Sequence, residues 1–79
     1  MTKSIHSKNY SRFLDLLISA RKEAALTQVD VAARLSCPQS FVSKYENGER
    51  RLDVVEFLEV AKAIGFDPVD LINSLSKPQ

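Results

Sequence analysis

Residues 27–48, TQVDVAARLSCPQSFVSKYENG, place a proline between two short segments that both have helical character. Val31, Ala32 and Leu35 recur at i, i+1 and i+4, which gives one apolar stripe at the period of an α-helix. Pro38 has no backbone N–H and disfavours helical geometry in the residue before it, so the first helix must end before Pro38 and a second can begin there. The stretch therefore predicts two short helices joined by a tight turn.

Both ends of this stretch carry residues that favour helix termini. Thr27 is a suitable N-cap, because its hydroxyl can accept a hydrogen bond from a free N–H of the first turn. Asp30 stands three residues further on, where it can complement the helix dipole as the acid of a capping box does. Asn47 and Gly48 tolerate positive φ, so we expect the second helix to end there.

The outward side of the second helix has an unusual composition for a solvated face. If Val42, Tyr45 and Phe41 point inward, the residues left outside are Gln39, Ser40, Ser43 and Lys44. Amide, hydroxyl and ammonium groups can bond to base edges, and Lys can also bind phosphate. The alternative is an ordinary solvated face, since short polar sets are common by chance.

The same stretch contains Leu26-Thr27-Gln28, Val31-Ala32, Leu35, Gln39-Ser40, Val42-Ser43 and Tyr45-Glu46-Asn47-Gly48. At this spacing it resembles the helix-turn-helix of the phage-repressor family, the XRE-type or Cro/repressor-like regulators. The resemblance extends from Arg12 to about Leu71. It implies an all-α fold: a compact five-helix bundle, a lambda-repressor-like DNA-binding domain whose helices 2 and 3 form the helix-turn-helix.

Three residues depart from the family pattern. The family often has Gly where Ala25 and Ser36 stand, and a capping Ser where Pro38 stands. Ala and Ser adopt positive φ only at an energetic cost, so these departures bear on the geometry of the turns and leave the outward face unchanged.

The remaining helices follow from apolar periodicity and caps. Helices are predicted over 10–24, 54–64 and 68–75, so the domain spans 10–75 between a flexible arm (1–9, with Ser7 or Asn9 as cap) and a tail (76–79). The inward stripes are Phe13, Leu14, Leu17, Ile18 and Ala24 in the first helix and Val54, Phe57, Val60, Ala61 and Ile64 in the fourth. Arg12 is expected to face water.

The charge is unevenly distributed, although the net charge is only +1. Residues 1–52 hold nine Lys and Arg against five acids, giving +4, whereas residues 53–79 hold two against five, giving −3. This polarity suits a protein that turns one side to phosphates and the other to something else.

Composition favours neither an enzyme nor a membrane protein. The 79 residues include one His and one Cys, with the acids scattered on solvated faces, so no catalytic or metal-ligand constellation is visible. We expect no cofactor, metal or small-molecule ligand. With no signal peptide and no membrane-spanning apolar run, a reducing cytoplasm fits. Cys37 is expected to be a small buried hydrophobe; a redox switch is the alternative.

The resemblance implies roles for individual residues on DNA. Base contacts are implied for Gln39, Ser40, Ser43 and Lys44. Backbone contacts are implied for Arg21, Thr27, Gln28, Asn47, Arg50 and Arg51. Arg21 is also expected to form a salt bridge with Glu46, with an unpaired surface arginine as the alternative; for Arg50 and Arg51 the alternative is a solvated charge pair.

We therefore expect a sequence-specific transcriptional regulator that binds double-stranded DNA, a repressor acting as a dimer on an inverted-repeat operator, with activation as an alternative. The dimer surface is predicted to contain Val55, Leu58, Leu71, Ile72 and Leu75. Alternatively the last helix only closes the monomer core. A different class remains open: a protein-interaction module, such as an antitoxin-like partner with secondary DNA binding.

Overall fold

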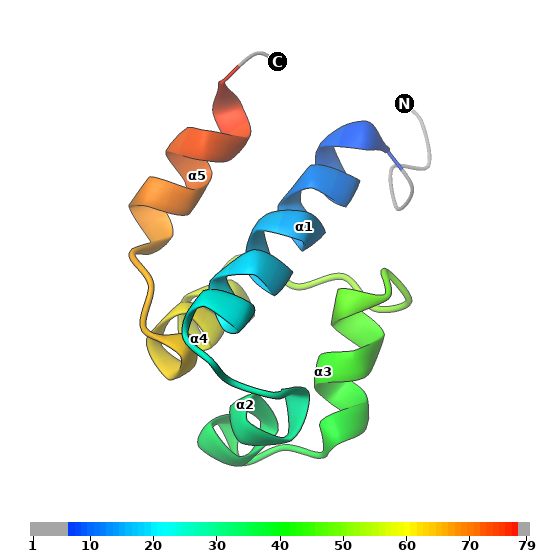
Figure 1. Ribbon diagram of the computed structural model, residues 1–79. Helices are drawn as coiled ribbons and strands as arrows, with labels where there is room; N and C mark the ends of the chain where they lie inside the picture. The colour runs from blue at the N-terminus through cyan, green and yellow to red at the C-terminus, as the bar shows by residue number, and fades with distance from the viewer. Residues whose placement is uncertain (1–6, 78–79) are drawn as a thin grey trace.

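Five helices follow one another in residues 7–77, the part of the chain that the structure, a computed structural model, describes. They are α1 (Lys8–Glu23), α2 (Gln28–Leu35), α3 (Gln39–Glu46), α4 (Val54–Ile64) and α5 (Pro68–Ser76) (Figure 1). No β-strand occurs between residues 7 and 77. The predicted all-α, five-helix fold is confirmed.

Side-chain caps fix where the helices begin. Ser7 caps α1 by accepting a hydrogen bond from the backbone N–H of Tyr10, so α1 begins two residues earlier than predicted. The predicted arm therefore overlaps α1 at residues 8 and 9, and its residues 1–6 lie outside the described part of the chain. At the other end, α5 includes Ser76, which the sequence had assigned to the tail.

Capping boxes start both α2 and α4. Thr27 accepts from the N–H of Asp30 while the Asp30 carboxylate accepts from the N–H of Thr27, as the sequence predicted. Asp53 and Glu56 repeat this arrangement at α4. Each box satisfies backbone donors that a helix start would otherwise leave free.

The turns around α2 use a left-handed backbone at residues that are not glycine. Ala25 has φ 60° and Ser36 has φ 56°, so both adopt the conformation for which the family often uses Gly. The sequence suggested that α3 begins at Pro38, but the helix begins at Gln39. Pro38 is its N-cap and has an extended backbone. The extended ψ of 151° at Pro38 explains this difference, because a first helical residue needs helical ψ.

The core receives buried side chains from all five helices. Its fully buried side chains are Leu17 from α1, Val31 from α2, Val42 and Tyr45 from α3, and Val60 from α4. α2 packs on α3 and α4, while α1 lies beside α5 (Figure 1). Two residues assigned to the inward stripes are wrong: Ala24 is exposed just beyond the end of α1, and Val54 is 73% exposed in the first turn of α4.

Arg12 joins the first helix to the last and is half-buried there, whereas the sequence predicted only that it faces water. Its Nη1 donates to the carbonyl oxygen of Leu75 at 2.9 Å, and its Nη2 donates to that of Ser74 at 2.8 Å. The last turn of α5 contains no basic residue, and Arg12 supplies donors to carbonyls that a helix end leaves without intrahelical partners. Among residues 7–77, no helix is long and apolar enough to cross a membrane.

Candidate nucleic-acid interface

The exposed side of α3 carries the polar residues that the sequence singled out. Gln39, Ser40 and Lys44 are exposed, and Ser43 is half-buried. The opposite side is anchored by Val42 and Tyr45, both 0% exposed. Because the buried side is fixed in the core, the direction in which the polar side points is fixed as well.

Phe41 completes the anchoring of α3. Its side chain is half-buried, and its ring centroid lies 5.6 Å from that of Tyr45 in an edge-on arrangement.

The Tyr45 hydroxyl is buried without a hydrogen-bond partner among the described residues, and burial raises the pKa of Tyr45.

A buried ion pair joins α1 to the last residue of α3. Arg21 Nε donates to Glu46 Oε2 at 2.8 Å and Arg21 Nη2 donates to Glu46 Oε1 at 3.1 Å, which is a two-pronged contact. The side chains are 12% and 4% exposed. Arg21 Nη1 also donates to the carbonyl of Leu26, so the guanidinium joins α1, α3 and the loop before α2.

This environment stabilises the charged form of Arg21. The hydrogen bonds that Arg21 donates to Glu46 raise the pKa of Arg21 above its ordinary value, against an opposing effect of burial. Three of the five N–H donors of the guanidinium are used by protein acceptors. The arginine therefore holds three segments in register, whatever else it contacts.

Two glutamines extend this network to the surface. Gln28 Nε2 donates to Glu46 Oε1 at 2.9 Å, and Gln39 Nε2 donates to Gln28 Oε1 at 3.1 Å. Gln28 and Gln39 are the first residues of α2 and α3, so their bond joins the N-termini of the two helices. Sequence reasoning treated them separately, although their common position as first residues of adjoining helices was a signal that they could meet.

The two arginines after α3 occupy different settings. Arg50 makes two hydrogen bonds to Glu56, at 2.7 and 3.1 Å, and its guanidinium lies 4.8 Å above the ring of Phe41. Arg51 lies 4.1 Å above the ring of Tyr10 in α1. Both arginines are exposed, as is Asn47 at the end of α3. The sequence assigned no role to Glu56. Its place three residues after Asp53 was a signal for a capping box, but nothing in the spacing pointed to Arg50.

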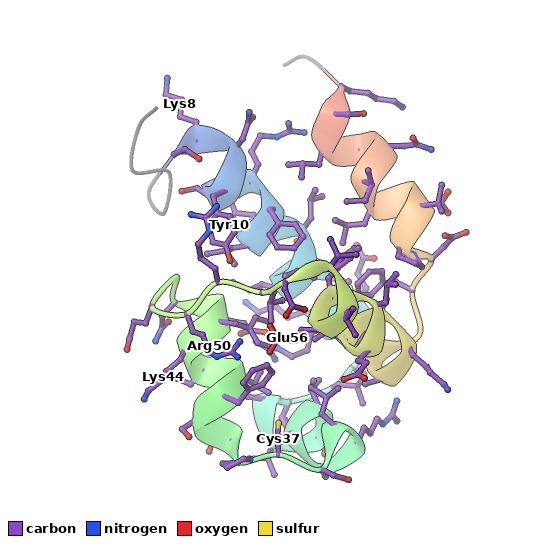
Figure 2. All side chains as sticks on the ribbon, turned by 180° about the vertical axis from the view of Figure 1, so that it is seen from behind. Lys8, Tyr10, Cys37, Lys44, Arg50 and Glu56 are labelled. Carbon is purple, nitrogen blue, oxygen red and sulfur yellow. The ribbon has the colours of Figure 1, made fainter. Side chains whose placement is uncertain are left out.

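Cys37 lies in the turn between α2 and α3 and packs against the core (Figure 2). It is half-buried, and this burial raises the pKa of the thiol. Residues 7–77 contain no group of three or more His, Cys, Asp and Glu residues that could hold a metal ion.

A second distinctive surface lies on α4 and α5, away from the polar side of α3. An apolar groove of about 330 Å³ is lined by Val54, Phe57, Leu58, Pro68, Val69 and Ile72. Val55, outside this groove, is 65% exposed. Of the residues assigned to a dimer surface, Val55, Leu58 and Ile72 are exposed, whereas Leu71 is in the core and Leu75 is half-buried against it.

Comparison with known proteins assigns a family to this arrangement. Residues 17–71 match the family model described as helix-turn-helix. The chain is 38% identical over 52 residues to the HTH-type transcriptional regulator y4dJ of Sinorhizobium fredii. The aligned stretch covers 66% of this chain and 68% of that protein.

Solved structures agree. An XRE-family like protein from Pseudomonas syringae pv. tomato superimposes with a TM-score of 0.86 at 55% identity, over 95% of this chain and 94% of that one. A point mutant of the restriction–modification controller protein C.Esp1396I has a TM-score of 0.78 at 23% identity, over 87% of each chain, which shows a shared fold. The chain belongs to the XRE-type helix-turn-helix family of DNA-binding transcriptional regulators.

Proposed function

We propose that the protein is a repressor that binds an inverted-repeat operator as a homodimer. The observation that carries the proposal is the polar side of α3, held on a buried core and joined through Gln28 to the Arg21–Glu46 pair. A rigidly mounted helix of this kind can place its side chains against base edges in the major groove. Repression follows when such a complex covers a promoter.

The base-reading set consists of Gln39, Ser40, Ser43 and Lys44. Gln39 can pair with adenine, because an amide both donates and accepts, and Lys44 can donate to guanine. The bond to Gln28 uses one N–H of Gln39 and leaves its carbonyl oxygen and second N–H available. This supports a two-point contact to a single base.

Backbone contacts supply affinity and register around that set. They are proposed for Gln28 and Thr27 at the α2 N-terminus, where free N–H groups favour phosphate, and for Arg21, Asn47, Arg50 and Arg51. These contacts are independent of sequence and weaken as salt rises.

The dimer is proposed to form through the exposed apolar side chains of α4 and α5. Val54, Val55, Leu58, Val69 and Ile72 are 45–73% exposed, and residues beyond 52 carry a net charge of −3. An apolar, acidic surface suits protein contact better than contact with DNA. We propose that a second copy of the chain covers this surface, because one recognition helix contacts too few base pairs to specify a single site in a genome.

The same surface favours a second candidate, a protein-interaction module whose DNA binding is secondary. Selection of bound sites from a random pool of duplexes distinguishes the two. The proposal requires an enriched inverted repeat, with half-sites spaced by about one helical turn or a multiple of it. A pool with no enriched sequence would favour the interaction module.

A further inference from the structure

Arg50 lies in the loop that follows α3, and its charge is already paired with a carboxylate of the protein. Arg50 Nη2 donates to Glu56 Oε2 at 2.7 Å and Nη1 donates to Glu56 Oε1 at 3.1 Å. Nη1 also donates to the backbone oxygen of Arg51 at 3.2 Å. In Figure 2 the guanidinium of Arg50 points toward Glu56, whereas the side chain of Lys44 extends away from it.

Both partners are held in place by other contacts. The Glu56 carboxylate accepts from the N–H of Asp53 at 3.0 Å as part of the α4 capping box, so its position is set by the helix start. The Arg50 guanidinium rests on the ring of Phe41. Their mutual hydrogen bonds raise the pKa of Arg50 and lower that of Glu56, so both remain charged near neutral pH.

A carboxylate and a phosphate compete for the same donors of a guanidinium, since both accept its two-pronged hydrogen bonds. A phosphate that reached the remaining N–H groups of Arg50 would meet a pair that is neutral overall. Such a contact would release few counterions, and counterion release supplies most non-specific affinity for DNA.

Resting on the proposed DNA binding, we propose that Glu56 competes with DNA phosphates for Arg50 and thereby limits the non-specific affinity of the protein. Glu56 is then a determinant of how strongly the protein binds any DNA. The exposed pair is suited to this role, because it contributes little to stability and its loss leaves no buried charge.

The experiment measures the affinity for a random-sequence duplex over a range of KCl concentrations. The variant is Glu56→Gln, which keeps an oxygen for the N–H of Asp53 but removes the negative charge. The expected result is a plot of log K against log salt that is steeper by about 0.9, the value for one added phosphate contact. The double variant Glu56→Gln/Arg50→Gln has the same net charge as the wild type but lacks the guanidinium, so the steepening caused by Glu56→Gln should disappear.

Glu59→Gln is the matched control. Glu59 is an exposed acid one turn further along α4 and forms neither of the two ion pairs found among the described residues. Its substitution removes the same charge and should leave the slope unchanged. The inference is overturned if Glu56→Gln leaves the slope unchanged, if Glu59→Gln steepens it equally, or if the double variant stays as steep as Glu56→Gln.

Two further outcomes are decisive. If Glu56→Gln fails to unfold cooperatively, Glu56→Asp replaces it: Asp30 already serves as the capping acid of α2, and the shorter side chain draws the carboxylate back from Arg50. A steeper slope, though by less, is then expected, and an unchanged slope overturns the inference. Failure of the wild type to bind any duplex would overturn the proposed function itself, whereas binding with equal slopes in all variants would overturn this inference alone.

Discussion

The helix-turn-helix and the pair of helices α4 and α5 share one core but expose opposite kinds of side chain. α3 presents Gln39, Ser40 and Lys44, which are polar, whereas α4 and α5 present five aliphatic side chains that are 45–73% exposed. The charge follows the same division, +4 up to residue 52 and −3 after it. The difference teaches that a core of this size can support two chemically distinct surfaces when each helix has one side committed to the interior.

The two regions also use their ion pairs differently. The Arg21–Glu46 pair behind the helix-turn-helix has side chains only 12% and 4% exposed, while those of the Arg50–Glu56 pair are 44% and 27% exposed. A charge left alone in the interior is costly, whereas an exposed pair contributes little. The helix-turn-helix should therefore be the region more sensitive to loss of a charge.

The largest effect is expected for Glu46→Ala. It leaves Arg21 buried without its carboxylate and removes the acceptor of Gln28, so the free energy of unfolding should fall by about 3–5 kcal/mol and DNA binding should weaken with it. Chemical denaturation and a binding assay at low temperature measure both. Glu49→Ala, at an exposed acid in the following loop, is the control and should change neither. An unchanged unfolding midpoint in Glu46→Ala would contradict the structural role of the pair.

On the opposite surface, Leu58→Glu should give a folded monomer. A charge in the proposed interface should cost about 2 kcal/mol or more of association free energy and weaken operator binding accordingly. Sedimentation equilibrium measures the association. Val29→Glu places the same charge at a 59% exposed valine on α2. It should leave self-association, measured in the absence of DNA, unchanged. A wild-type protein that stays monomeric at high concentration and binds one copy per site would exclude the proposed dimer.

Within the helix-turn-helix, Gln39→Ala and Lys44→Ala should each cost about 1–3 kcal/mol on the selected operator and little on random duplex. The reason is their position on the exposed side of α3. Titration of both duplexes at a single salt concentration gives the comparison, with Asn73→Ala on α5 as the control. Equal losses on the two duplexes would mean that the side chains contact only the backbone.

The smallest effects should come from the turns of the helix-turn-helix. Ala25→Gly and Ser36→Gly should each raise the free energy of unfolding by about 0.5–1 kcal/mol, because glycine adopts positive φ without the strain of a side chain. Thermal and chemical denaturation measure the gain. Ala33→Gly, at an exposed helical position of α2, should do the reverse. A loss of stability at residues 25 and 36 would mean that the side chains make contacts worth more than the strain.

Local patterns in the sequence were enough to predict most of the fold. The capping residues Ser7 and Thr27, the breaker Pro38 and the apolar periodicity were enough to predict all five helices to within two residues at each end. These signals act over one or two turns of chain, so a single sequence contains them.

The sequence did not reveal the contacts that long charged side chains make with residues distant in the chain. Arg12 contacts carbonyls more than sixty residues away, and the position of Arg50 beside Glu56 follows from the path of a loop rather than from any periodicity. Resemblance to the family supplied the partner of Arg21, which periodicity could not have identified. The proposed DNA contacts remain predictions, since the fold fixes only where these side chains stand.

The hydrogen bonds from Arg12 to the end of α5 bear on how this helix unfolds locally. α5 has nine residues, too few for a stable isolated helix, and the residues that Arg12 joins are 62 and 63 positions apart. We expect the backbone amides of α5 to exchange hydrogen through a local unfolding that leaves α1 to α4 folded. Such an opening would displace Val69 and Ile72, two of the five exposed aliphatic side chains, while the helix-turn-helix persists. The proposed dimer should therefore come apart before α3 unfolds.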